Sequence, residues 1–437
     1  MAPTKSVQFV PPLQVLSQQV SDAAQVISHY CENAKVPHPS LDSLDFPADT
    51  PKFVLEAQAV IQSTAIKLQQ IAVGPGDFIA GLAIPYQTLV SIQWLCRFKI
   101  MFHVPRDCSM PYTAVAQSAG VPIAQLKSIS RMAMLTNFFA EPVPGELANS
   151  PLSLRFVDDP SLLEWLLYIA EIGSPTAGRM VEATERWGVT SHKAQTAANL
   201  FFKTEKPLFD YFATRPDLSQ KFAGYMKNAS RSPATSPDHV LRGFDWASLG
   251  KGTVVDIGGS KCHITLALAG AFPELRFVVQ DLPAAIAAGR TLLKDRPSEM
   301  TSRITLQDYD FFRPQPVIGA DVYLFRTIFH DWADHDAIRI LNNQVSAMAE
   351  NPQSRLLIVD IVLPEPGSVD LKEESLLRVQ DLKMMQTFNS YERELSDWMR
   401  LLDEANDLNQ LGGRFGLKGV SRPFGSLLSV LEIVLEI

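Results

Sequence analysis

The chain has 437 residues, 46% of them hydrophobic and 20% charged, so it is long and apolar enough for two or three domains with a sizeable core. Its formal net charge of -8 at pH 7 argues against binding to a nucleic-acid backbone as the main activity. The four cysteines form no CxxC pair and the N-terminal segment lacks the apolar run of a signal peptide, which argues against a disulfide-stapled secreted protein and predicts a reducing, cytoplasmic location.

Residues 1–110 have the pattern of amphipathic helices. Segments 23–30 and 53–71 repeat their apolar residues at intervals of three and four. Segment 85–102 is apolar on almost every side, which is typical of a helix buried on most faces, either in a large core or at a subunit interface. No window approaches the ~18 uninterrupted apolar residues of a membrane span. We therefore expect a helical dimerisation region, a homodimer and no membrane partner.

Residues 111–160 form a second region with a different pattern. A helix, a tight turn and another helix are followed by apolar segments at 138–141 and 152–156 that predict two short strands. This is the outline of a winged helix, an element that often binds DNA. The second helix offers only Lys127 and Arg131 as basic residues, so we expect a winged-helix-like segment without a nucleic-acid partner.

Helical segments continue through a connector at 161–245, and from residue 246 onward strands alternate with helices. The apolar runs of these strands are continuous, as parallel strands covered on both faces require. Segments 415–420 and 427–437 predict a terminal hairpin. Residues 246–437 therefore predict an α/β fold, a doubly wound, Rossmann-like domain.

The strongest single motif is a strand that ends in glycines, residues 254–259. Glycines there let the backbone approach a ligand at the carboxyl end of the sheet, and Asp281 follows at the end of the next strand, where an acid can bind ribose hydroxyls. The run does not fit the GxGxxG register of dinucleotide folds. Asp256 would also oppose a pyrophosphate, but it suits a cationic ligand such as the aminoacyl and sulfonium part of S-adenosylmethionine.

A series of motifs in this order resembles those of S-adenosylmethionine-dependent small-molecule O-methyltransferases, above all the fungal branch of secondary metabolism. The motifs lie at residues 254–259, 280–283, 307–312, 325–332, 357–364 and 388–393. The resemblance extends over nearly the whole chain, because the N-terminal helices and the winged-helix-like segment are similar to the dimerisation region of that family. It implies an enzyme with S-adenosylmethionine as its cofactor.

The resemblance also implies which residues bind the cofactor. Gly258 would lie by its amino-acid end, and Asp281 would bind its ribose. Asp310 and Phe311 would flank the adenine, and Arg326 takes the place of a basic residue near the cofactor. The cofactor-binding set is therefore Asp256, Gly258, Gly259, Asp281, Asp310, Phe311 and Arg326.

The resemblance further implies that His330 is the general base, with Asp360 and Glu392 holding and polarising its ring. The chemistry explains these residue types, since a phenol with a pKa of about 10 can give its proton to a nearby imidazole as the methyl group transfers. A carboxylate on the other ring nitrogen fixes the tautomer and stabilises the imidazolium.

Cys262 departs from the family pattern, because glycine normally stands where the backbone passes close to the cofactor. A side chain there would crowd the methionine part, which puts cofactor binding in doubt. The leading function is O-methylation of a hydroxyl on a polyketide or aromatic metabolite. The alternative is a pericyclase or dehydratase that cyclises a polyketide–peptide pyridone without methyl transfer. A nucleophilic Cys262 and a non-catalytic regulator are less favoured.

Two further groups of residues remain to be assigned. His330 and His335 stand about 140° apart around a helix, so they cannot share a metal, and we expect none. Methionine and phenylalanine side chains near residue 385 line either an apolar substrate pocket or plain helix core, and a histidine from the N-terminal region could reach such a pocket. The candidate substrate-pocket residues are His103, Met384, Met385 and Phe388.

Overall fold

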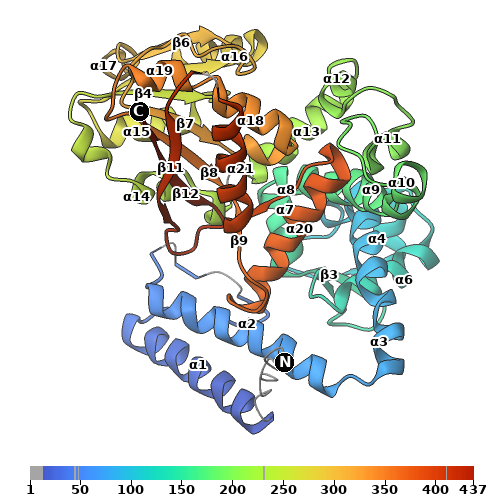
Figure 1. Cartoon of the computed structure of the whole chain (residues 1–437). Coiled ribbons are helices and arrows are strands. Elements are labelled where there is room, and N and C mark those ends of the chain that lie inside the picture. Colours follow the sequence, from blue (N-terminus) through green and yellow to red (C-terminus); the bar gives the residue numbers. More distant parts are fainter. Residues whose placement is uncertain (1–12, 44–45, 48, 230–231, 410) are drawn as a thin grey trace, which may run out of the picture. The chain divides into compact units, whose positions relative to one another are not determined.

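The computed structural model describes residues 13–43, 46–47, 49–229, 232–409 and 411–437 (Figure 1). The N-terminal segment that underlies the predicted location lies outside these residues. The chain divides into two compact units. The first comprises Met1–Ser174 with Gly367–Glu374, and the second comprises Pro175–Pro366 with Ser375–Ile437.

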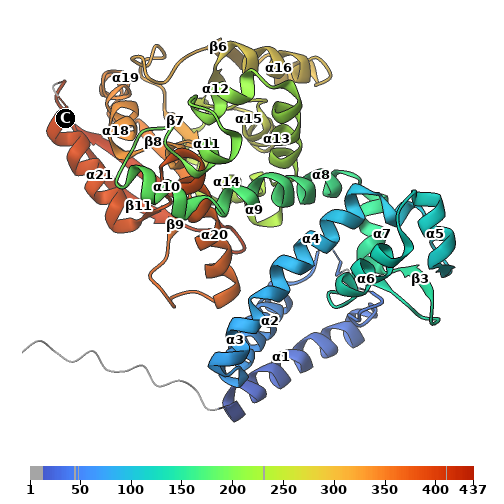
Figure 2. The ribbon, with the colours of Figure 1, turned by 90° about the vertical axis from the view of Figure 1, so that its right-hand side faces the viewer.

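The first unit is mainly helical and contains one small sheet. Its helices are α1 (Leu13–Ala34), α2 (Lys52–Ala72), α3 (Pro75–Gly81), α4 (Ala83–Arg97), α5 (Tyr112–Ala119), α6 (Ile123–Met134), α7 (Pro151–Asp158) and α8 (Ser161–Tyr168). Its strands are β1 (Met110–Pro111), β2 (Phe139–Ala140) and β3 (Glu146–Asn149), in the antiparallel order β1-β3-β2. Helices α1 and α2 lie side by side in Figures 1 and 2.

The predicted strand at 152–156 is wrong, because these residues belong to helix α7. Ser150 caps this helix, with its side chain accepting from the Ser153 amide and the Ser153 hydroxyl accepting from the Ser150 amide. Pro151 at the first helical position fixes a helical φ. These local capping signals outweigh the apolar pattern that suggested a strand.

Helix α4 is not buried on most of its faces within the described chain. Ile84, Tyr86 and Val90 are each more than half exposed, whereas Leu95 is fully buried. Among the residues that the structure describes, Pro75–Arg97 is the one stretch long and apolar enough to cross a membrane by length and composition. Polar residues such as Gln87 and Gln93 interrupt this stretch, so it does not contradict the expectation about uninterrupted apolar runs, and by itself it carries no argument for a membrane span.

The second unit contains a seven-stranded sheet in the order β11-β12-β8-β7-β4-β5-β6. Its strands are β4 (Thr253–Ile257), β5 (Arg276–Asp281), β6 (Ile304–Asp308), β7 (Val322–Arg326), β8 (Arg355–Asp360), β11 (Arg414–Ser421) and β12 (Ser429–Glu436). The strands from β8 to β6 are parallel, and the predicted terminal hairpin is present as the antiparallel pair β11–β12. The predicted α/β fold is thereby confirmed.

Helices lie on both faces of this sheet, as Figure 2 shows for α15 and α18. The helices of the unit are α10 (Met180–Trp187), α11 (Ala197–Phe202), α12 (Leu208–Ala213), α13 (Pro216–Ala229), α14 (Pro237–Gly243), α15 (His263–Ala271), α16 (Pro283–Leu293), α17 (Ser298–Thr301), α18 (Asp334–Asn342), α19 (Val345–Ala349) and α21 (Leu395–Leu408). The short helix α9 (Ser174–Ala177) and the longer helix α20 (Leu371–Phe388) each span a division between the units. Val255 and Phe325 belong to the core cluster with α18 and α21, whereas Val254 and Leu324 belong to the cluster with α14 and α15. Alternate residues of one strand thus fill opposite layers, which leaves the strand ends to form a site.

The division between the compact units lies at Ser174 and Pro175, so the predicted connector 161–245 is shared between them. The reason is visible in α14, whose Val240 is buried in the core beneath the sheet. The indole Nε1 of Trp246 donates to the Val240 carbonyl at 2.9 Å. The helices that precede the first strand of the sheet therefore pack as part of the α/β unit.

Candidate active site

Four charged side chains stand near the carboxyl ends of four neighbouring strands. In spatial order from β8 through β7 and β4 to β5 they are Asp360, Arg326, Asp256 and Asp281. Arg326 Nη2 donates to the Thr235 carbonyl at 2.8 Å, but its buried Nε has no hydrogen-bond partner among the described residues. Burial lowers the pKa of Arg326, and the negative charges of Asp256 and Asp360 oppose this change. The strand ends therefore hold an alternating charge pattern and a free donor for a polar ligand.

Strand β4 continues into a turn in which only glycine fits. Gly258 has a φ of +74°, and a Cβ there would lie 2.5 Å from Ile328 Cδ1. A Cβ on Gly259 would lie 2.7 Å from the carboxylate Oδ2 of Asp256. Both glycine amides donate to the Gln280 carbonyl, at 2.8 and 3.3 Å, which holds the turn against β5. The result is a bare backbone turn of the kind that a cofactor can approach closely.

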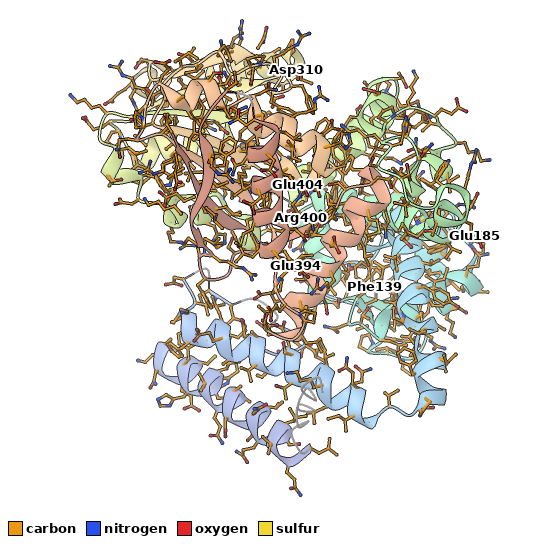
Figure 3. The ribbon with its side chains drawn as sticks, in the orientation of Figure 1. Phe139, Glu185, Asp310, Glu394, Arg400 and Glu404 are labelled. Atoms are coloured by element: carbon orange, nitrogen blue, oxygen red, sulfur yellow. The ribbon has the colours of Figure 1, made fainter. Side chains whose placement is uncertain are left out.

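Asp281, Asp310 and Phe311 lie at the ends of two adjacent parallel strands. Asp281 Oδ2 accepts from the Ser260 amide at 2.8 Å, and burial raises the pKa of its carboxyl group. The amide of Tyr309 donates to the Asp281 carbonyl at 2.9 Å, which places the loop after β6 beside the end of β5. Figure 3 labels Asp310 on this loop. The arrangement suits one elongated ligand along this edge of the sheet.

Cys262 occupies the N-terminal cap of α15 in the left-handed conformation, with a φ of +63°. Its Sγ lies against α16, because a Cβ added to Gly289 would be 3.2 Å from it. The thiol is fully buried, and burial raises its pKa to about 12, so it carries no thiolate near neutral pH. The side chain is buried against α16, which argues against a nucleophile, and its effect on cofactor binding stays a prediction.

His330 lies on a short 3₁₀ turn, Phe329–Asp331, at the same edge of the sheet. Its Nδ1 is 2.9 Å from Glu392 Oε1 and 3.9 Å from Asp360 Oδ1. Its Nε2 is 3.7 Å from Asp331 Oδ1, beyond hydrogen-bond distance. The structure thus brings together the predicted base and both carboxylates predicted to polarise it.

Strand pairing explains how these distant residues meet. Strand β9 (Val362–Leu363) follows β8 and pairs in parallel with β10 (Arg393–Glu394), which brings Glu392 beside Asp360. The Glu392 amide donates to Asp381 Oδ1 at 3.0 Å, so α20 also holds this residue in place. Asp360 Oδ2 accepts from the amide of Phe329 at 3.1 Å, next to the histidine.

The cluster is buried and unusually charged. One oxygen of each carboxylate, Asp360 Oδ1 and Glu392 Oε2, lacks a hydrogen-bond partner within the described ranges. Burial raises the pKa of Asp360 to about 7 and that of Asp331 to about 6. Burial alone would lower the pKa of His330, but the negative charges of Glu392, Asp331 and Asp360 raise it to about 10. The imidazole is therefore a strong base whose protonated form is stabilised by its neighbours.

Sequence reasoning missed two residues of this cluster, Asp331 and Arg393. Asp331 faces the outer nitrogen of His330, and the fully buried Arg393 donates to the backbone around it. Each adjoins a predicted catalytic residue in the sequence, and this adjacency was the available signal. Adjacency in the sequence does not say what either side chain contacts, because those contacts depend on the fold.

The predicted substrate-pocket residues are divided between the two units. His103 belongs to the first unit, whereas the other three lie on α20. Met384 is buried, and Phe388 stacks on Phe209 of α12 with ring centroids 5.1 Å apart. Met385 is partly exposed. Their contact with a substrate stays a prediction.

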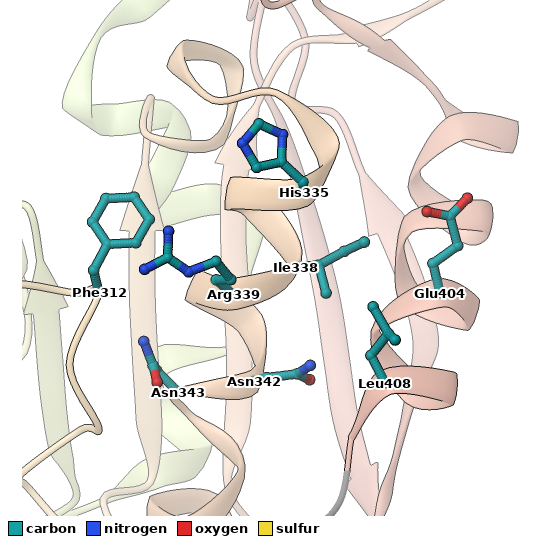
Figure 4. A pocket seen from close by; sticks show the side chains of 8 residues that line it. All are labelled: Phe312, His335, Ile338, Arg339, Asn342, Asn343, Glu404 and Leu408. Carbon is teal, nitrogen blue, oxygen red and sulfur yellow. The ribbon is translucent and has the colours of Figure 1, made fainter. Parts of the chain in front are cut away.

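A separate hollow of about 530 Å³ lies between α18 and α21 (Figure 4). His335 and Arg339 line it from α18, and Glu404 and Leu408 line it from α21. It contains none of the predicted catalytic or cofactor-binding residues. Across the residues that the structure describes, no group of three His, Cys, Asp or Glu side chains is placed to hold a metal ion.

Comparison with known proteins decides the family. The model of the O-methyltransferase domain matches residues 189–406. The chain is 41% identical over 433 residues to O-methyltransferase VdtC of Byssochlamys spectabilis, covering 97% of this chain and 98% of that protein. It is 38% identical over 434 residues to O-methyltransferase pgmB of Aspergillus terreus, covering 98% and 97%. The chain belongs to the O-methyltransferase family. The predicted family and an enzyme of methyl transfer are thereby confirmed.

Two solved structures and a second domain model also match this O-methyltransferase. The crystal structure of OxaC matches with a TM-score of 0.74 at 24% identity, covering 97% of this chain and 99% of that one. A structure titled "A Pericyclic Reaction enzyme" matches with a TM-score of 0.72 at 21% identity, covering 96% and 100%. At such identities both show the fold alone, so the pericyclase alternative has only the fold in its favour. Residues 11–73 match a domain described as the N-terminal domain of the trypacidin cluster transcriptional coactivator tpcD.

Proposed function

We propose that this O-methyltransferase transfers a methyl group from S-adenosylmethionine to a hydroxyl of a small aromatic or polyketide-type secondary metabolite. The observation that carries the proposal is the buried contact of His330 Nδ1 with Glu392 Oε1 at 2.9 Å, at the same sheet edge as the glycine turn. A base and a cofactor turn at one edge of a sheet are what a methyl transfer to a hydroxyl requires.

The residues at the strand ends fit S-adenosylmethionine. The bare turn at Gly258 admits close approach, and the unpartnered Nε of Arg326 offers a donor to a polar part of the ligand. Related structures are titled as OxaC in complex with sinefungin and meleagrin and as LepI in complex with SAM. When bound, the cofactor supplies an electrophilic methyl group. The residues proposed to hold it are Asp256, Gly258, Gly259, Asp281, Asp310, Phe311 and Arg326.

His330 acts as the general base in this proposal. In the neutral ring, Nδ1–H donates to Glu392 and leaves Nε2 to take the proton of the acceptor hydroxyl. The imidazolium that forms is stabilised by Glu392, Asp331 and Asp360, which raise the pKa of His330 to about 10 despite its burial. This value lies close to the pKa of a phenol, about 10, so proton transfer between them is nearly balanced.

The same pKa sets the expected pH dependence. A raised pKa means that the proton-accepting form of His330 is scarce at neutral pH and increases as the pH rises toward about 10. We therefore expect kcat/KM to rise through the alkaline range instead of levelling off near the pKa of a free imidazole, about 6.5.

The quaternary state and location belong to the proposal as well. Tyr86 and Val90, four residues apart on α4, form an exposed apolar stripe that supports a homodimer. A sedimentation mass equal to the 48.4 kDa of one chain at micromolar concentration would contradict it. We propose a cytoplasmic enzyme without nucleic-acid or membrane partners, whose winged-helix-like segment is structural. The proposed substrate pocket includes His103, Met384, Met385 and Phe388.

The test is incubation of the purified protein with S-adenosylmethionine and phenolic acceptors of increasing ring number. We expect S-adenosylhomocysteine to form together with a product that is heavier by one CH₂ group. Formation of an isomerised or dehydrated product without S-adenosylhomocysteine would overturn the proposal in favour of a cyclase.

A further inference from the structure

The segment Ser390–Arg393, here called the clasp, contacts the base loop, Phe329–Asp334, with every one of its side chains. The Ser390 hydroxyl donates to the Trp332 carbonyl at 3.0 Å. The Tyr391 hydroxyl donates to Asp334 Oδ2 at 2.9 Å, and Glu392 accepts from the base itself. The clasp, a loop that leads into β10, thus binds both the backbone and the side chains of the loop that carries His330.

Arg393 makes the largest share of these contacts. Its Nη1 donates to the Phe329 carbonyl at 3.0 Å, and its Nη2 donates to the Trp332 carbonyl at 2.9 Å. These carbonyls lie on either side of His330 and Asp331 in the sequence. Nη2 and Nε also bind Asp334 Oδ1, at 2.7 and 3.1 Å. The guanidinium therefore fixes both ends of the turn that carries the base.

Burial makes these contacts strong and specific. The side chain of Arg393 is 1% exposed, and its guanidinium lies 5.3 Å from the ring centroid of Trp398. A buried charge needs all of its hydrogen bonds satisfied, and a planar guanidinium can satisfy two carbonyls and a carboxylate at once. Lysine, with a compact ammonium group, cannot reproduce this fork.

We propose that Arg393 is a positioning residue for the methyl transfer, which fixes the base loop so that His330 stays in contact with Glu392. The inference rests on the proposed function, because it assigns a role to Arg393 through the base. Arg393 touches neither the substrate nor the cofactor in this proposal. Its effect reaches the reaction through the place and the basicity of the imidazole.

Apart from the Phe329 amide, which donates to Asp360 Oδ2, the amides of Asp331 and Trp332 bond only within the turn itself, so Arg393 is the main link from the turn's carbonyls to the rest of the fold. Thr327, just before it, has a left-handed φ of +51°, and a single 3₁₀ turn follows. Without Arg393 the Phe329 carbonyl keeps only the Trp332 amide at 3.1 Å, and the Trp332 carbonyl keeps only the Ser390 hydroxyl. The charged groups around the base come from the loop itself, β8, the clasp, β7 and the segment before α11. They are Asp331, Asp360, Glu392, Arg326 and Lys193.

Arg400 provides a matched control, because it contacts the same carboxylate from the solvent side. Its Nη2 lies 3.3 Å from Asp334 Oδ2 and 3.0 Å from the Tyr391 hydroxyl. It is half exposed and lies on α21 near Glu404, as Figure 3 shows. It donates to no carbonyl of the base loop in the described structure. A change at Arg400 therefore alters the charge near Asp334 without releasing the loop.

The experiment compares Arg393→Lys with Arg400→Lys in the full-length protein. Both variants keep the positive charge, so a difference between them reports geometry. For Arg393→Lys we expect kcat to fall by roughly 10- to 100-fold, because a small misplacement of a catalytic group has effects of this size. The pKa of His330, followed by NMR titration of the imidazole, should fall toward about 6.5 as its contact with Glu392 loosens.

The affinity for S-adenosylhomocysteine should remain unchanged in both variants, and Arg400→Lys should leave kcat and the His330 titration as in the parent. A folded Arg393→Lys protein with the parental kcat and parental His330 titration would overturn the inference. If Arg393→Lys does not fold, Asp334→Asn takes its place, because it removes the carboxylate charge that Nη2 and Nε of Arg393 bind. A folded Asp334→Asn protein with the parental kcat and the parental His330 titration overturns the inference equally.

The readouts separate this inference from the proposed function. If the parent protein forms no methylated product while Arg393→Lys alone lowers the pKa of His330, the proposed function fails and the positioning role stands. If the parent methylates and His330→Ala abolishes turnover while the Arg393→Lys protein retains both parental values, the positioning role alone fails.

Discussion

The glycine turn after β4 and the base loop after β7 lie on neighbouring strands, yet they are built in different ways. The turn at Gly258 is local. Its shape depends on a positive φ and on the absence of a Cβ, which leaves room for the neighbouring side chains. The base cluster joins His330 to a carboxylate 62 residues away, and it depends on charges and buried hydrogen bonds. Substitutions in the turn should therefore change cofactor affinity, whereas those in the base cluster should change turnover and its pH dependence.

The largest effect is expected for His330→Ala. Loss of a general base lowers turnover by roughly 10²–10⁴-fold, while calorimetric affinity for S-adenosylhomocysteine should stay at the parental value. His335→Ala is the matched control, since this exposed histidine lies on α18, outside the base cluster. Parental turnover in His330→Ala would remove the residue from the mechanism.

Glu392→Gln should lower turnover by a smaller factor of about 10–10², because the ring keeps a hydrogen-bond partner but loses the charge that stabilises the imidazolium. The pKa of His330 should fall, and the alkaline rise of kcat/KM should move to lower pH.

The pH dependence of stability follows from the raised pKa of His330. The stabilising charge interaction is fully present below about pH 6.5 and is lost as the pH rises through about 10. The free energy of unfolding of the parent, measured by denaturant titration, should thus decrease over this pH range. That of Glu392→Gln should decrease less. An equal pH dependence in both would contradict the charge interaction.

Gly258→Ala should act on the cofactor side of the comparison. The left-handed conformation costs about 1–3 kcal/mol for a residue with a Cβ, and that Cβ would also collide with Ile328. Gly250→Ala is the control, since Gly250 has a φ of +55° but no atom within 4 Å of an added Cβ. Titration with S-adenosylhomocysteine should show weaker binding only for Gly258→Ala. Equal affinities would show that the turn tolerates a side chain.

The smallest effect is expected for Cys262→Gly. Relief of a left-handed φ offsets the loss of a buried thiol, so the free energy of unfolding should change by about 1 kcal/mol or less. Cofactor affinity should not change, because Sγ faces Gly289 on α16. A severalfold gain in S-adenosylmethionine affinity would mean that the thiol crowds the turn after all.

The sequence predicted those parts of the molecule whose signals are local. Continuous apolar strands, the glycine turn and the strand-end acids are each written in a few consecutive residues. The role of Arg393 could not be predicted, because the carbonyls that it binds are set by a loop more than fifty residues earlier. The strand expected at 152–156 failed for the opposite reason, since the cap at Ser150 is a local signal that apolar periodicity does not include. The exposure of α4 depends on what covers it, which no residue pattern states.

The unpartnered oxygens of Asp360 and Glu392 have a consequence for how this enzyme changes over generations. A buried acceptor without a donor costs about 1–3 kcal/mol of folding free energy, so joint replacement of His330, Asp360 and Glu392 by apolar residues should raise resistance to heat. Such variants would keep the fold and lose turnover. Selection for robustness alone would therefore discard the site, and only selection for the product maintains these carboxylates against drift toward stable, inactive descendants.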